Sequence, residues 1–172
     1  MRQRTASLLV LVLLTLLVVL LVTNPPTVLL DPGEYETTTV SVHDDNGTKL
    51  ATVDVKLADT PEKRQIGLRR TDSLEEDEGM LFVHPESDTH TYHMRGVSFP
   101  LDIVFVADNG TITKIHHASA SLRSYFDRYR GEGKYVLEVE RDWTTTRNVQ
   151  QGDVLNIPEN VTEGAKNGTN VP

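Results

Sequence analysis

The chain has 172 residues, 25 acidic and 17 basic, and its net charge of −8 argues against non-specific binding to nucleic acid or to an anionic membrane surface. It contains no cysteine, which excludes a disulfide framework, a thiol nucleophile, a thiolate metal site and a lipidated cysteine. An acidic surface with more arginine than lysine would suit a salt-rich environment, because salt screens repulsion between like charges.

The N-terminal segment predicts a membrane anchor. Arg2 and Arg4 precede an apolar run from Ala6 to Val22, whose 17 residues would span roughly 26 Å as a helix, near the lower limit for crossing a bilayer. The alternative is a cleaved signal peptide, but no small-x-small cleavage pattern follows the run. We therefore expect a short cytoplasmic segment at 1–5 and a single-pass anchor at 6–23. Because positive residues stay on the cytoplasmic side, the rest of the chain would lie outside the cell membrane.

A polar stalk is expected after the anchor, over residues 24–38, because Asn24-Pro25-Pro26 ends the helix. Four Asn-x-Thr sequons fit an extracytoplasmic location and mark candidate glycosylation sites, namely Asn46, Asn109, Asn160 and Asn167. The first two also belong to Asn-Gly pairs, which favour hairpin turns, and the two interpretations are compatible because a turn is exposed.

The globular domain is expected over residues 39–158 and begins with a hairpin. Valines alternate with polar residues on both sides of Asp45-Asn46-Gly47, a pattern typical of two antiparallel strands joined by a turn. A short helix follows, with Thr60 as its N-cap and Pro61 at its first position, and it should end by Arg70.

The later elements are mostly short strands. A second hairpin pairs 101–107 with 111–117 across Asp108-Asn109-Gly110. The other predicted elements are strands at 79–84 and 88–94, a loop at 119–133, a strand at 134–140, a short helical turn and a last strand at 154–157. The fold class is thus α+β, mostly antiparallel β-sheet or a partly closed barrel with two short helices, preceded by one transmembrane helix. The polar tail at 159–172 is predicted to be disordered.

Two motifs carry a family resemblance, Glu78-Gly79-Met80-Leu81-Phe82 and the segment Pro100 to Phe105. Taken in order with "YVLEV" at 135–139, they make residues 40–158 resemble the domain-of-unknown-function family number 192. The resemblance implies an exported or membrane-anchored domain and supplies no established reaction. Many relatives have a Trp-Met pair before the "PLDI" segment, where this chain has Tyr92-His93-Met94, and many have a cysteine that is absent here.

Asp102 is the main candidate for chemistry, because it interrupts the apolar strand "PLDIVFV" and a buried carboxylate needs partners. One interpretation is structural, with Asp102 accepting backbone N–H groups from the preceding turn at 95–99. The other is a ligand-binding or acid–base carboxylate working with His93, His116 or His117.

The remaining candidates are histidines and a basic loop. His90 and His93 should face opposite ways in a strand, as should His116 and His117, so no metal site and no cofactor are expected. The loop 119–134 combines positive charge with aromatic rings and could hold a carboxylate, a phosphate or a sugar. Its candidate ligand-binding residues are Arg123, Tyr125, Arg128 and Arg130. The alternative is that the loop packs its aromatic rings onto the barrel mouth.

The expected function is a membrane-anchored, extracytoplasmic, non-catalytic module that binds a ligand or a protein. Its expected partners are the lipid bilayer and an unidentified extracytoplasmic ligand or protein, with no nucleic acid. The alternative is a hydrolase-type enzyme acting on a cell-envelope sugar or peptide through Asp102 and a nearby histidine. A third interpretation, a purely structural domain on a stalk, predicts no cleft.

Overall fold

The computed structural model describes residues 11–16, 32–121 and 123–162, apart from the Tyr125 side chain. The chain divides into two units, Met1–Asp31 and Pro32–Pro172. In the first unit, residues 11–16 are helical, and most of the predicted anchor and stalk lies outside the described residues. Among the described residues, no helix combines the length and the apolar character that a membrane crossing requires.

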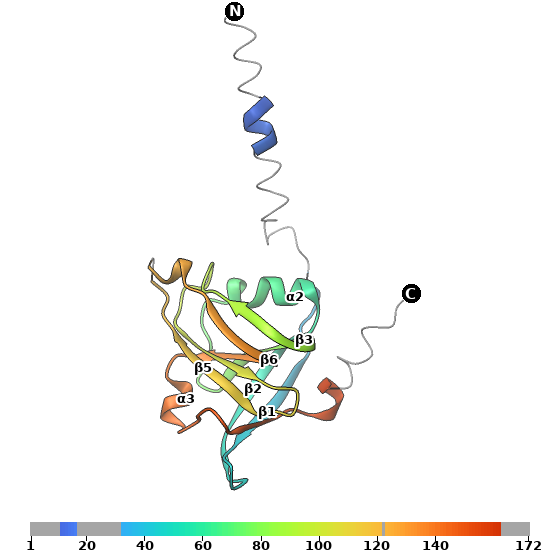
Figure 1. Cartoon of the computed structure of the whole chain (residues 1–172), viewed down its shortest axis with the longest axis vertical. Coiled ribbons are helices and arrows are strands. Elements are labelled where there is room, and N and C mark those ends of the chain that lie inside the picture. Colours follow the sequence, from blue (N-terminus) through green and yellow to red (C-terminus); the bar gives the residue numbers. More distant parts are fainter. Residues whose placement is uncertain (1–10, 17–31, 122, 163–172) are drawn as a thin grey trace, which may run out of the picture. The chain divides into compact units, whose positions relative to one another are not determined.

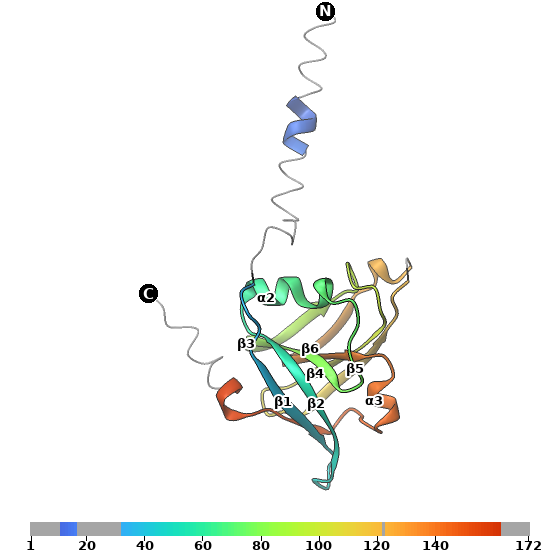
Figure 2. The same ribbon diagram turned by 180° about the vertical axis from the view of Figure 1, so that it is seen from behind.

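The second unit is built on one seven-stranded sheet with the order β5-β4-β6-β3-β2-β1-β7 (Figures 1 and 2). The strands are β1 (Thr37–His43), β2 (Lys49–Ala58), β3 (Glu78–Tyr92), β4 (Leu101–Val106), β5 (Ile112–Ala118), β6 (Tyr129–Glu140) and β7 (Val154–Asn156). Neighbouring strands are antiparallel except β2 and β3, which are parallel. A bridge between Thr111 and Val154 also joins β7 to the start of β5, so the two edges of the sheet meet. The predicted mostly antiparallel, partly closed barrel is confirmed.

Both predicted hairpins form with turns that use side-chain acceptors. In the first, the Asp44 carboxylate accepts the backbone N–H groups of Asn46 and Thr48 at 3.0 and 2.7 Å. Gly47 follows with a φ of 81°, a left-handed conformation that glycine adopts without strain. In the second, the side-chain oxygen of Asn109 accepts the N–H of Thr111 at 3.0 Å. The Asn-Gly pairs therefore specify both turns, as predicted.

The predicted short helix is α2 (Pro61–Ile66), which continues as the 3-10 helix η2 (Gly67–Arg70). The Thr60 hydroxyl caps it by accepting the N–H of Lys63 at 3.2 Å. The other predicted helical turn is α3 (Trp143–Thr146), and a short 3-10 helix, η3 (Ser124–Phe126), lies in the loop before β6. In both views α2 and α3 lie at opposite ends of the sheet (Figures 1 and 2).

The prediction of two separate strands at 79–84 and 88–94 was wrong, because β3 is one strand that folds back on itself. In a straight strand, His84 and His90 would lie roughly 20 Å apart. Their rings instead stack with centroids 3.5 Å apart, and the bend coincides with a register shift between Val83 and Asp88. The predicted loop at 119–133 was also too long, because β6 begins at Tyr129 and follows the outer half of β3.

Two glycines of β6 let the folded-back parts of β3 and β6 lie close to β4. A Cβ on Gly133 would lie 2.5 Å from the backbone oxygen of Val106, and a Cβ on Gly131 would overlap the ring of Phe105. The β6 backbone therefore approaches the β4 backbone at Gly133 and the Phe105 ring at Gly131, and neither position has room for a larger side chain. The outer halves of β3 and β6 form what we call the β3–β6 arm, residues 88–92 with 129–133.

Two apolar clusters lie on the two faces of the sheet. Alternate residues of β4 divide between them, with Val104 in the cluster inside the barrel and Ile103 in the cluster outside it. The outer cluster is covered by η2 and the β3–β6 arm, whose Leu68 and Tyr92 belong to it. Residues 159–162 form a helical turn with Val161 buried in the inner cluster. The first four residues of the predicted disordered tail, 159–162, therefore belong to the folded domain. Residues 163–172 lie outside the described residues.

Candidate functional site

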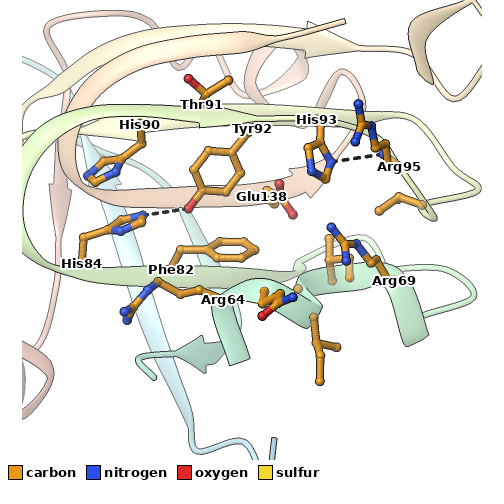
Figure 3. A pocket seen from close by; sticks show the side chains of 15 residues that line it. Arg64, Arg69, Phe82, His84, His90, Thr91, Tyr92, His93, Arg95 and Glu138 are labelled. Carbon is orange, nitrogen blue, oxygen red and sulfur yellow. Dashed lines mark hydrogen bonds between the residues drawn. The ribbon is translucent and has the colours of Figure 1, made fainter. Parts of the chain in front are cut away.

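A pocket of about 330 Å³ lies between α2–η2, the inner half of β3 and the β3–β6 arm (Figure 3). Its size is near the lower end of the range for small-molecule sites. The charged and titratable residues that line it are Arg64, Arg69, His84, His90, Tyr92, His93, Arg95 and Glu138. Each element contributes some of them because each presents one face to the space that the fold-back of β3 encloses.

Glu138 is the buried acidic residue of this pocket. It lies on β6 opposite Met80 of β3 and Ile103 of β4, and only 5% of it is exposed. Among the described residues, no hydrogen bond reaches its carboxyl group. Burial raises the pKa of Glu138 to about 8, although nearby Arg69 opposes the rise. At neutral pH the carboxyl is therefore mostly protonated and can donate a hydrogen bond into the pocket.

Positive charge in the pocket comes from guanidinium groups. Arg64 is held by two bonds from its Nη1, to the backbone oxygens of Asp59 at 2.6 Å and Val83 at 2.8 Å. Arg69 lies on η2 and Arg95 on the segment after β3, and both line the same pocket as Glu138 (Figure 3). Three guanidinium groups therefore line the pocket in which Glu138 is buried.

Two of the histidines that line the pocket, His84 and His93, contribute little positive charge. Burial, with help from His90 and Arg64, lowers the pKa of His84 to about 3, and the His84 Nε2 lies 3.0 Å from the Tyr92 hydroxyl. Burial also lowers the pKa of His93, and the nearby charges of Arg69, Arg95 and Arg128 add to the effect. His84 and His93 are therefore neutral at pH 7 and act as polar walls.

Asp102 lies elsewhere and is fully buried. Its Oδ2 accepts the backbone N–H of Thr144 at 3.0 Å and the Thr144 hydroxyl at 2.6 Å, while its Oδ1 lies 2.6 Å from His117 Nδ1. The expected bonds to the preceding turn at 95–99 are absent from these contacts, so that part of the structural interpretation was wrong. Thr144 is the second residue of α3. The N-cap residue of this helix is Asp142, whose side chain makes no capping hydrogen bond. Asp102, which lies on β4, therefore supplies the hydrogen-bond acceptor for a backbone N–H at the start of α3, where no acceptor within the helix is available.

His117 is the exposed partner of Asp102, with 42% of its side chain accessible. Ligand atoms of Asp102, His117 and Asp142 lie within 4.8 Å of one another, a convergence that the sequence did not predict. The Nε of Arg141 lies 2.9 Å from Asp142 and 3.9 Å from Asp102. A positive charge therefore already occupies this cluster, which disfavours a metal cation there.

The other predicted catalytic candidates do not join Asp102. The His116 ring packs against Phe105 and Tyr129, and its Nε2 lies 2.9 Å from the backbone oxygen of Arg130. Adjacent residues of a strand face opposite sides, so His116 lies on the face away from Asp102. His93 lines the pocket described above.

The predicted basic loop is separate from the pocket lining. Arg123 is exposed, and the exposed Arg128 donates from Nη1 to the backbone oxygens of Phe126 and Asp127. Arg130 donates from Nε to the Thr91 hydroxyl at 3.2 Å. The side chain of Tyr125, the fourth candidate, is not among the described parts of the chain.

Three of the four candidate glycosylation sites are exposed, at Asn46, Asn109 and Asn160, and Asn167 lies outside the described residues.

Glu138 was missed at the sequence level, although it carries the signal that identified Asp102. It is a single carboxylate between Leu137 and Val139 in an apolar strand. The three arginines of the pocket gave no such signal, because α2, η2 and the segment after β3 look solvent-exposed when the fold-back of β3 is not known.

Comparison with known proteins supports the fold and gives no reaction. The family model DUF192, described as "Uncharacterized ACR", matches residues 41–157. A solved structure from Sinorhizobium meliloti 1021, described as a candidate transcription regulator, is 27% identical with a TM-score of 0.67, covering 73% of this chain and 97% of that one. A protein of unknown function from Novosphingobium aromaticivorans is 25% identical with a TM-score of 0.62, covering 70% of this chain and 85% of that one. No curated protein matched.

Proposed function

Because the chain belongs to the DUF192 family, whose description assigns no activity, we propose from the geometry of the pocket that this protein is a binding module for a small anionic molecule. The pocket between α2–η2 and the β3–β6 arm would be its ligand site. The N-terminal apolar run supports the further proposal that the module is anchored in the cell membrane with the domain outside.

One observation carries the proposal. Glu138 is a buried carboxyl group that no hydrogen bond reaches among the described residues, and it lies at a pocket that three arginines line. A buried polar group costs free energy unless it has a partner, so its retention in a cavity favours a ligand that supplies one. Guanidinium groups that line a partly enclosed site favour an anion as that ligand. The net charge of −8 argues against DNA as that ligand.

A thermal-shift screen of the full-length chain against small carboxylates, phosphate and sulfate tests the proposal. Arg69→Gln removes a charge from the pocket, and Arg123→Gln removes one from the exposed loop as a matched control. We expect Arg69→Gln to weaken the binding of an anion at least tenfold and Arg123→Gln to leave it unchanged. The opposite result would place the site in the loop 119–134, and no binding by any anion would refute the proposal.

A second candidate function rests on the contact between Asp102 and His117. A buried carboxylate that orients an exposed imidazole is an arrangement found in general acid–base catalysis, and it favours the alternative of a hydrolase acting on an envelope sugar or peptide. Neither residue lines the 330 Å³ pocket. Turnover of such a substrate that is lost in His117→Ala and kept in His116→Ala would support this function over the first.

A further inference from the structure

We propose that the pocket selects a carboxylate and holds it as an acid pair with Glu138, whose proton remains in the pocket while the ligand is bound. This inference rests on the proposed function and deepens it, because it names the class of anion and ties binding to one proton. Three features of the described residues lead to it.

The first feature is the hydrogen bond that Glu138 can offer. A protonated carboxyl donates one O–H, and a carboxylate oxygen is a strong acceptor for it. Glu138 as a residue is 5% exposed and lines the pocket, so this side chain is more than nine-tenths buried yet borders the cavity. A neutral amide or hydroxyl ligand would also accept this bond, but it would form no ion pair with a guanidinium group of the lining.

The second feature is the position of the guanidinium groups around that donor. In Figure 3, Arg69 lies on the α2–η2 side of the pocket and His93 and Arg95 lie on the opposite side, and Glu138 lines the same pocket. A carboxylate has two oxygens in one plane, so one can accept the Glu138 O–H while the other faces a guanidinium group. Arg64 is already fixed on two backbone oxygens and contributes charge without moving.

The third feature is the order in which the two acids of the pair release their protons. Ordinary carboxylic acids have pKa values of about 4, whereas burial raises the pKa of Glu138 to about 8. The proton therefore stays on Glu138, and the ligand keeps its charge to face the arginines. Phosphate at neutral pH carries a proton of its own, so its binding would not need the proton of Glu138.

A dependence on pH follows, and its direction can be checked against the charged and titratable groups that line the pocket beside Glu138. These groups are Arg64 on α2, Arg69 on η2, His84, His90 and Tyr92 on β3, and His93 and Arg95 after it. Outside the lining, Asp59 and Glu62 lie near Arg64, and Arg128 lies near His93. The pKa values of His84 and His93 are lowered and that of Tyr92 is raised well above 10, so none of these three changes charge between pH 7 and 9. Above pH 8 Glu138 ionises and repels the carboxylate. Affinity should fall about tenfold from pH 7 to pH 9, following the protonated fraction of Glu138.

Calorimetric titration of the full-length chain tests the proposal with acetate, benzoate and D-glucuronate. Acetamide, benzamide and D-glucose serve as neutral counterparts, and phosphate and sulfate as other anions. We expect at least one carboxylate to bind more than tenfold more tightly than its neutral counterpart at pH 7. At pH 8.5, titrations in two buffers of different ionisation enthalpy should show uptake of a large fraction of one proton per ligand bound.

Variants separate this role of Glu138 from a purely structural one. Glu138→Gln keeps a neutral donor, so it should bind the carboxylate at pH 7 within about tenfold of the wild type. It should also show no proton uptake at pH 8.5 and a flat affinity from pH 7 to 9. Glu140→Gln, an exposed glutamate at the end of the same strand, should behave as the wild type.

The outcomes distinguish this inference from the proposed function. Phosphate or sulfate binding in the pocket without proton uptake would overturn the carboxylate pair and leave the anion-binding module standing. Wild-type affinity that stays constant from pH 7 to 9, or proton uptake that persists in Glu138→Gln, would overturn it as well. If none of the anions binds, both proposals fail.

Discussion

Replacement of Asp102 by asparagine tests whether this buried carboxylate holds the fold together. The change keeps the size of the side chain and removes its charge. In the wild type, three donors reach the carboxylate, namely the N–H and hydroxyl of Thr144 and the Nδ1 of His117. Hydrogen bonds to charged groups contribute about 1.5–3 kcal/mol each and neutral ones about 0.5–1.5 kcal/mol. Loss of the charge should thus cost about 1 kcal/mol for each bond, or roughly 3 kcal/mol in all.

The assay is thermal and urea unfolding of the full-length chain, followed by circular dichroism. For a domain of this size, about 3 kcal/mol corresponds to a fall in Tm of roughly 10 °C. Asp142→Asn is the matched control, because Asp142 is exposed and its ion pair with Arg141 should contribute less than about 1 kcal/mol. A variant Asp102→Asn that melts at or above the wild-type temperature would refute the reasoning, and would mean that the charge is retained for a function, as the second candidate function requires.

Three further predictions concern the pocket, the β3–β6 arm and the C-terminal turn. Glu138 has a pKa of about 8 in the folded protein and 4.5 as its reference, so the folded state binds the extra proton and stability should fall as pH rises from 4.5 to 8. Glu138→Gln should therefore be more stable than the wild type at pH 8, by on the order of 3 kcal/mol, and equal to it near pH 4.5; equal urea midpoints at both pH values would contradict this. Gly133→Ala should lose about 1–3 kcal/mol because its Cβ would meet β4 backbone, whereas the exposed neighbour change Glu132→Ala should cost little in the same melts. Val161→Ala should cost roughly 1–2 kcal/mol in urea unfolding and Asn160→Ala almost nothing; identical midpoints would mean that residues 159–162 do not belong to the core.

Short-range patterns in the sequence were sufficient to predict several elements of secondary structure. The hairpins follow from alternating apolar residues on either side of Asn-Gly turns, and α2 follows from the cap at Thr60 and the proline after it. In each case the interactions that define the element join residues only a few positions apart. The family resemblance over 40–158 likewise agrees with the matched model over 41–157.

The candidate sites were predicted less completely. Asp102 was identified as a buried carboxylate, but its partner Thr144 lies 42 positions later in the chain and could not be inferred from neighbouring residues. The expected partner, the turn at 95–99, was the nearest source of N–H groups in the sequence. A contact over this separation depends on how β4 and α3 pack, which no local pattern specifies.

What the sequence determined by itself was the class of fold, the turns, the first helix and the buried position of an acidic residue, since each is set by periodicity or by contacts within one turn. Only the tertiary structure decided that β3 folds back on itself, because this bend depends on pairing with β6 and on the close approach that Gly131 and Gly133 allow. The fold-back brings Arg64, Arg69 and Glu138 to one pocket from elements up to 74 positions apart. The pocket therefore exists only in the folded chain.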